Sequence, residues 1–227
     1  MGRDFGLFGE YGSNNDRSPV PLWMTRDDGR SWHIEKYLNS IRHVHGVYGD
    51  PFSSSVWLTT GDKDGECHLI EFRNGETGKF IFHGNGTQLC RPVGLYFSKT
   101  FLSWGMDSEI SKCQIVTLDR VTGELGRHSF LPGPCWYIKK FLDNSCVFQT
   151  SVEVGIGSTS NHSHIFFSQD GVTLYDVAKF KKDFWPKKLF KFGVIGFASG
   201  DQTKSDFVIF GEALKGIDGS IYRCRIS

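Results

Sequence analysis

This 227-residue sequence lacks a long apolar run, an excess of one charge and any paired-cysteine motif. No stretch approaches the roughly 18 apolar residues that a membrane-spanning helix needs, so we expect no membrane span. The 26 basic and 25 acidic side chains leave a net charge of +1. Nucleic-acid-binding surfaces usually carry a strong basic excess, so the near balance argues against a nucleic-acid partner.

The six cysteines form neither a CxxC pair nor a zinc-ligand spacing, and no metal site is assigned to them. Most lie in predicted strands, which favours free buried thiols in a reducing compartment over disulfides. The first twelve residues contain no apolar signal-peptide core, so the sequence as given predicts a cytoplasmic protein. No phosphate-binding loop follows the glycines at 155 and 157, and no cofactor is expected.

What the sequence does contain is aromatic residues, glycines and a repeat. Each repeat has an apolar strand that ends in an acidic residue, and these residues are spaced by 52, 45, 46 and 59 positions. They are Glu10, Asp62, Asp107, Glu153 and Glu212. One strand precedes most copies, a third strand follows, and a fourth follows where the chain is long enough. Four antiparallel strands at this period are typical of a propeller blade.

The sequence therefore predicts an all-β fold, a β-propeller with four-stranded antiparallel blades, as a single domain over 1–227. About five blade units are expected, at approximately 1–40, 41–86, 87–132, 133–190 and 191–227. The first unit lacks its innermost strand and the last its outermost. This indicates either an unusual five-bladed closure or part of a larger, six- or seven-bladed propeller. The polar and aromatic segment 176–191 is expected to be a loop or insertion.

Residues 25–32, Thr-Arg-Asp-Asp-Gly-Arg-Ser-Trp, fit the Asp-box pattern Ser/Thr-x-Asp-x-Gly-x-Ser/Thr-Trp at every defined position. Asp27 is expected to accept hydrogen bonds from the hairpin backbone, and Gly29 to supply a turn conformation without a Cβ penalty. A degenerate copy stands at 168–173, starting 143 residues later in the corresponding slot of its unit. Such boxes indicate architecture rather than catalysis.

On these residues the chain resembles the Asp-box (BNR-repeat, sialidase-like) β-propellers, in particular uncharacterised bacterial members linked to glycan metabolism. Further segments that carry the resemblance are 8–11 (FGEY), 41–62, 91–97, 102–108 and 118–124. The resemblance implies a propeller with a glycan-related role but no defined reaction. The Arg-Ile-Pro motif of true sialidases is absent, which argues against sialidase activity.

Polar residues within the apolar inner strands are the candidate site, because the inner strands of a propeller line its channel. We assign catalytic roles to His43, His45, Asp62, Asp107 and Glu153. We assign substrate binding to Glu10, Arg42, Arg91, Trp104 and Gln149. Strand alternation places His43 and His45 on one face and Arg42 on the other.

Each of these patterns has more than one interpretation. The two histidines suit a metal or acid/base chemistry, or are hydrogen-bonded at a blade boundary. The acidic residues suit the paired carboxylates of glycoside hydrolysis, a cation site, or solvated charge at strand ends. Arginines suit the capture of a sugar carboxylate or phosphate, and Trp57, Trp104 and Trp136 suit stacking on sugar rings or core packing.

We therefore predict a propeller that binds or processes an acidic glycan at the channel mouth, as a glycosidase-like hydrolase if it is an enzyme. The alternatives are a non-catalytic scaffold for protein or glycan interaction, and a metal-dependent polysaccharide lyase. The expected partner is a carbohydrate with acidic groups.

Overall fold

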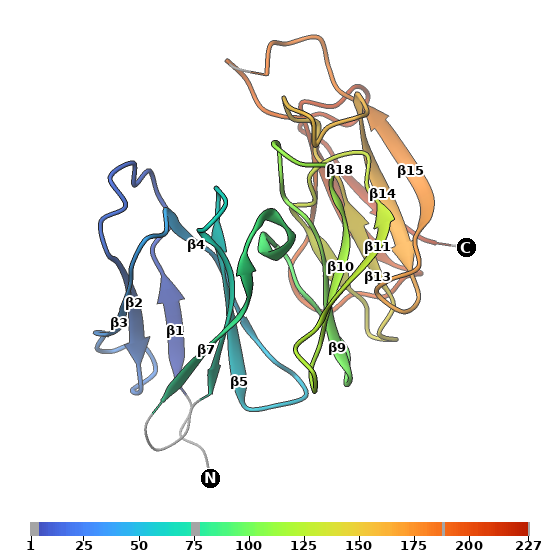
Figure 1. Cartoon of the computed structure of the whole chain (residues 1–227). Coiled ribbons are helices and arrows are strands. Elements are labelled where there is room, and N and C mark those ends of the chain that lie inside the picture. Colours follow the sequence, from blue (N-terminus) through green and yellow to red (C-terminus); the bar gives the residue numbers. More distant parts are fainter. Residues whose placement is uncertain (1–4, 74–77, 188, 227) are drawn as a thin grey trace. The chain divides into compact units, whose positions relative to one another are not determined.

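The computed structural model describes residues 5–73, 78–187 and 189–226, and this part of the chain is built from strands (Figure 1). The helical element among these residues is a single 3₁₀ turn, η1 (Gln88–Cys90). The strands form five antiparallel sheets, each made of strands that are consecutive in the chain. This is the blade pattern of a β-propeller, so the predicted fold class is confirmed. Within the described residues, no helix is long and apolar enough to cross a membrane.

The chain divides into two compact units, residues 1–91 and 92–227. Unit 1 contains a sheet of β1 (Gly6–Gly9), β2 (Val20–Thr25) and β3 (His33–Leu38). Its second sheet contains β4 (His43–Gly49), β5 (Ser55–Gly61), β6 (Cys67–Arg73) and β7 (Lys79–Gly86).

Unit 2 contains three sheets. The first holds β8 (Tyr96–Phe97), β9 (Phe101–Gly105), β10 (Gln114–Asp119) and β11 (Leu125–Phe130). The second holds β12 (Ile138–Lys140), β13 (Cys146–Gln149), β14 (His162–Ser168) and β15 (Tyr175–Lys181). The third holds β16 (Val194–Phe197), β17 (Phe207–Glu212) and β18 (Ile221–Cys224). Among the described residues, the first and last sheets of the chain thus have three strands, as expected.

Strand β15 corrects the prediction that the whole of 176–191 is a loop. It pairs antiparallel with β14 from Tyr175 to Lys181, and only the residues after it are irregular. The apolar positions Ala178 and Phe180 pack against the core of unit 2, whereas the other residues of the strand are exposed. An outer strand has little of its surface covered, so few of its positions need to be apolar and its sequence resembles a loop.

The core of unit 1 lies between its two sheets and follows the period-2 pattern of strands. Val20, Leu22 and Met24 of β2 are buried together with Leu58 of β5 and Phe72 of β6. Phe72 is fully buried, and its ring contacts Phe80 at 4.7 Å and Phe5 at 5.7 Å between centroids. Side chains from strands far apart in the sequence therefore hold this unit together.

All six cysteines are free, as predicted, and five of them are buried. Burial raises the pKa of the Cys67 thiol to about 12, so this thiol is protonated at neutral pH. A protonated, buried thiol is a poor nucleophile. Cys67 therefore acts as a packing residue.

The turns at 25–32 and 168–173 have closely similar hydrogen bonds. In the first, Asp27 accepts from the Ser31 backbone N–H at 2.9 Å and from its hydroxyl at 2.6 Å, while Thr25 Oγ1 accepts from the Gly29 N–H at 3.0 Å. In the second, Asp170 accepts from the Thr173 N–H and hydroxyl at 2.7 and 2.8 Å. The glycine of the first turn has a φ of 83°, a conformation that favours glycine.

These bonds lower the pKa of Asp27 to about 2, with the Ser31 hydroxyl as the largest cause. We expect Asp27→Asn to lower the Tm by a few degrees at pH 7, because the amide has only one acceptor oxygen. A depressed pKa stabilises the fold above the ordinary aspartate value of 3.8, and this contribution is lost as the pH falls through about 2. In thermal melts from pH 7 to pH 2, the Tm values of wild type and Asp27→Asn should therefore converge. Asp28→Asn is the control, and an equal effect of both changes would contradict the prediction.

Candidate functional site

The carboxylate of Asp62, which follows β5, is the centre of a polar cluster in unit 1. Its Oδ2 accepts from Arg42 Nη1 at 2.6 Å, and its Oδ1 accepts from Arg91 Nη2 at 3.2 Å. The Nε2 atoms of His45 and His43 lie 3.1 and 3.6 Å from the same Oδ1. We call these five residues the Asp62 cluster. Two guanidinium groups thus share one carboxylate.

A β-bulge in β4 places His45 in this cluster. The register of β4 against β5 runs from Val44 opposite Thr60 directly to Gly46 opposite Thr59, so His45 is the extra residue. His43 and His45 lie on the same side, as alternation predicts, and their ring centroids are 4.9 Å apart. The prediction that Arg42 faces away from them is wrong, because Arg42 precedes the strand and its long side chain reaches Asp62.

The imidazole of His43 is held in one orientation. Its Nδ1 lies 2.9 Å from the Gly12 carbonyl oxygen, which can only accept, so the Nδ1 atom carries a proton. Its Nε2 atom is buried, lies 3.6 Å from Asp62 Oδ1, and has no hydrogen-bond partner among the described residues. The Nε2 edge of the His43 ring therefore faces the Asp62 carboxylate.

The surroundings decide the charge states in the cluster. Although burial opposes ionisation, the His43 and His45 imidazoles and the Arg91 and Arg42 guanidinium groups around the carboxylate hold the pKa of Asp62 far below its usual range. Burial lowers the pKa of His45, so this ring is neutral at pH 7 and donates from Nε2. Asp62 is consequently a permanent anion, which suits it to orient cationic groups and not to donate a proton.

Residues behind Asp62 hold it in place. Gln88, the first residue of η1, donates from Nε2 to the Asp62 backbone carbonyl at 2.9 Å and accepts from Arg91 Nη1 at 3.3 Å. A Cβ at Gly61 would stand 2.8 Å from the His45 ring and 3.1 Å from the Arg91 side chain. Only glycine at position 61 thus lets both side chains approach the carboxylate in this arrangement.

A cavity of about 240 Å³ opens beside the cluster. Its lining residues include Glu10, Tyr11, Asn14, Arg42 and His43. The Arg42 side chain is 34% exposed, whereas that of Arg91 is 8% exposed. Arg42 is therefore the cluster member that can offer a charge to a ligand, and Arg91 acts through Asp62.

An aromatic ring stands at the same cavity. Tyr11 is 74% exposed and lies over the His43 ring, with centroids 4.2 Å apart. Glu10, the preceding residue, accepts from Trp23 Nε1 at 3.0 Å. The cavity therefore combines a guanidinium, a carboxylate and an open aromatic face.

The other four candidates belong to unit 2. Trp104 and Gln149 are fully buried, and neither amide atom of Gln149 has a hydrogen-bond partner in the described part of the chain. Asp107 is buried and accepts from Trp136 Nε1 at 3.0 Å, while Glu153 accepts from the Ser151 hydroxyl at 2.7 Å. Their catalytic and binding roles stay predictions.

Unit 2 has an aromatic cavity of about 300 Å³ near Trp136. Its lining comprises Trp136, Tyr137, Phe190, Lys191, Phe192, Val194, Phe210 and Glu212. Phe192 packs edge-on against Trp136 at 5.9 Å, and Lys191 pairs with Glu212 at 3.2 Å. Trp136, which the sequence offered as a stacking residue, thus does border a cavity.

No protein-family model matches the sequence. No curated protein matches it either. Among solved structures, the chain is similar to the GH93 α-L-arabinofuranosidase of Fusarium graminearum in complex with arabinobiose. The two share 10% identity over 98% of this chain and 77% of that chain, with a TM-score of 0.46.

The donor atoms of His43, His45 and Asp62 lie within 4.8 Å of one another, which is the spacing of a metal site. The charges beside them oppose this use. Both oxygens of Asp62 already accept from cationic or imidazole donors, and a divalent ion would stand next to Arg42 and Arg91. The arrangement is better suited to an anionic ligand at the exposed edge of Arg42.

The sequence analysis missed two contributors to this site. Tyr11 directly follows Glu10 in the segment FGEY, but an aromatic residue after a strand is common and gave no separate signal. Gln88 lies in a short polar segment with no pattern. Both became visible only when the fold placed Tyr11 beside His43 and Gln88 beside Asp62, which are distant from them in the sequence.

Proposed function

We propose that unit 1 binds an acidic saccharide in the cavity beside the Asp62 cluster. The observation that carries the proposal is Arg42, which Asp62 holds at 2.6 Å while a third of the side chain stays exposed at the cavity. A guanidinium held in place loses less entropy on binding a carboxylate than a mobile one. The sugar carboxylate would bind Arg42, its hydroxyls would bind Glu10, and a ring face would lie on Tyr11.

The choice of a saccharide rather than a simple anion rests on the mixed lining. Tyr11 offers an apolar face, and Glu10 offers an acceptor for hydroxyl groups but repels a bare anion. The resemblance to Asp-box propellers linked to glycan metabolism agrees with this class of ligand. Cleavage of the glycan stays a prediction, since the buried Nε2 of His43 faces Asp62 and the accessible groups serve binding.

We expect Arg42→Gln to weaken binding of an acidic oligosaccharide by about 10- to 100-fold, because one charge-assisted hydrogen bond is lost. Isothermal titration calorimetry with a uronic-acid oligosaccharide and its neutral counterpart measures this effect. Tyr11→Ala should weaken the binding of both sugars alike. Arg91 still neutralises Asp62 in Arg42→Gln, so the fold should persist, as circular dichroism will verify.

Arg73→Gln is the matched control. Arg73 belongs to the same unit and pairs with Glu71 at 2.8 Å, but it does not line the cavity. Its replacement should leave the affinity unchanged. Equal losses in the two variants, or wild-type protein that binds no acidic saccharide of the panel, would rule the proposal out.

A further inference from the structure

The segment between β15 and β16 in unit 2 exposes four large apolar side chains within seven residues. The exposed fractions are 77% for Phe184, 49% for Trp185, 80% for Leu189 and 52% for Phe190. We call these four residues the aromatic tip. The Trp185 ring lies between those of Phe184 and Phe190, at 4.7 and 4.9 Å, so the tip is one continuous patch. Contiguous exposed apolar patches mark interaction surfaces.

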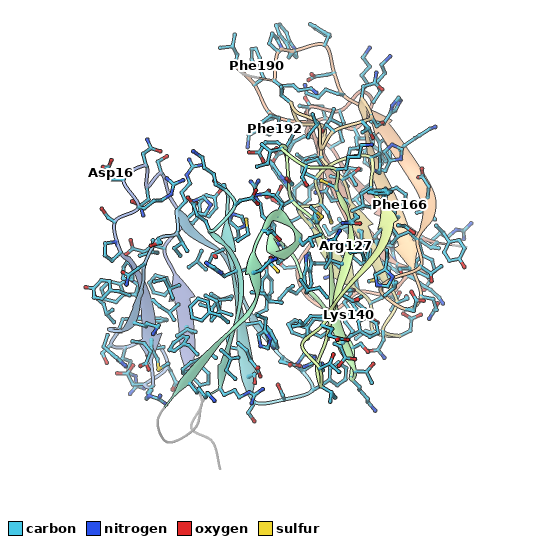
Figure 2. The ribbon with its side chains drawn as sticks, viewed as in Figure 1. Asp16, Arg127, Lys140, Phe166, Phe190 and Phe192 are labelled. Atoms are coloured by element: carbon cyan, nitrogen blue, oxygen red, sulfur yellow. The ribbon has the colours of Figure 1, made fainter. Side chains whose placement is uncertain are left out.

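The tip is held in shape by its own hydrogen bonds. The backbone N–H groups of Leu189 and Phe190 donate to the Pro186 carbonyl, which closes a turn. At its base the buried Lys182 pairs with Asp183 and also donates to the Trp185 carbonyl at 3.2 Å. The exposure of the tip therefore belongs to an ordered loop, and Figure 2 shows Phe190 at its outer end and Phe192 nearer the sheets.

Lysines flank the tip in the sequence. Residues 179–192 contain six lysines and one aspartate, a net of +5 in a chain whose total is +1. Lys182 and Lys187 are used internally, and Lys188 lies outside the described residues. Lys181, Lys191 and Lys215 are exposed, although Lys191 also pairs with Glu212 at 3.2 Å, and the Lys215 backbone N–H donates to the Lys181 carbonyl at 2.8 Å. We call these three residues the basic collar.

We propose that the aromatic tip and the basic collar dock unit 2 onto an anionic lipid surface. Phenylalanine, leucine and tryptophan at the tip would enter the boundary between headgroups and acyl chains, as in interfacial anchors. The lysines would contact anionic headgroups, each contributing about a fivefold gain in binding. An acidic polysaccharide would pair with the lysines but would leave the aromatic tip in water. A lipid surface therefore accounts for both the aromatic tip and the basic collar.

The residues of this surface all belong to unit 2, whereas the saccharide cavity is lined by residues of unit 1. Either proposal can fail without the other. The docking proposal also requires no membrane-spanning segment, since an interfacial anchor lies on the bilayer.

Vesicle co-sedimentation of the full chain is the test, with phosphatidylcholine alone and phosphatidylcholine mixed with phosphatidylserine. We expect wild-type protein to bind the mixed vesicles at least tenfold more tightly and to lose binding as salt is raised. The Trp185 emission should shift to the blue and be quenched by brominated lipids, a signal that Trp185→Phe removes. Lys181→Gln with Lys215→Gln should weaken binding about 25-fold.

Phe184→Ser with Leu189→Ser should abolish docking without lowering the Tm, since both side chains are exposed. Val121→Ser with Ile221→Ser is the matched control, because these residues of unit 2 are 93% and 76% exposed and lie outside the tip. Their replacement should leave vesicle binding unchanged. The proposal is overturned if mixed vesicles are not bound, if binding leaves Trp185 emission unchanged, or if the tip variant abolishes only self-association of the protein.

Discussion

Asp62→Asn is expected to lower the free energy of unfolding by about 3–5 kcal/mol, the cost of removing one partner from a buried ion pair. The change leaves Arg42 and the nearly buried Arg91 without their counter-charge, and the amide keeps only one acceptor oxygen for the donors of Arg42, Arg91 and His45. Urea unfolding at pH 7 measures the loss. Asp16→Asn is the control, since Asp16 is an exposed carboxylate on a loop of the same unit (Figure 2).

The same variant has a characteristic pH dependence. Because the folded pKa of Asp62 is far below 3.8, its contribution is fully present above about pH 4 and declines as the pH falls further. The unfolding free energies of wild type and Asp62→Asn should therefore converge in acid. A difference of less than 1 kcal/mol at pH 7, or a constant difference down to pH 2, would show that Asp62 does not hold the cluster together.

Phe72→Ala is expected to lower the free energy of unfolding by about 3–5 kcal/mol, because deletion of the core ring leaves a cavity. Phe72 is fully buried between β2 and β5 residues, and its ring contacts Phe5 and Phe80. Phe72→Leu keeps most of the volume and should cost much less. Urea unfolding of Phe72→Ala and Phe72→Leu separates the loss of packed volume from any effect of replacing Phe72 at all. Equal losses in the two variants would contradict the cavity explanation.

The two variants probe different parts of unit 1 and should behave differently with pH. The loss in Phe72→Ala comes from apolar burial and should not vary between pH 7 and 4. The loss in Asp62→Asn is electrostatic and should fall toward acid. Because Asp62 also orients Arg42, only Asp62→Asn is expected to affect saccharide binding strongly at temperatures where both variants are folded.

Much of the fold was accessible from short windows of sequence. Strands β2 and β5 are predicted by their alternating or continuous apolar residues, and the turn at 25–32 is predicted by Thr25, Asp27 and Gly29. Strand β15 was missed because Tyr175 to Lys181 shows only two covered positions, Ala178 and Phe180. Outer strands carry a weak pattern for this reason.

The site was accessible only in part. His43, His45 and Asp62 were selected as polar residues in apolar strands, and the structure places them together. The bulge at His45, the approach of Arg42 and the supporting role of Gln88 were not foreseen. A bulge depends on how a whole strand pairs with its neighbours, and no local pattern around residues 43 to 46 indicates it.

The sequence by itself determined the all-β class, the repeat of antiparallel strands, the turn at 25–32 and the identity of the polar residues in unit 1. These properties depend on side chains within a few positions of one another, where backbone geometry is set locally. The tertiary structure decided that Asp62 is shared by Arg42 and Arg91, that Tyr11 covers His43, and that the segment after β15 exposes an aromatic tip. Those outcomes depend on core packing, which aligns strands distant in the chain and leaves some side chains without cover.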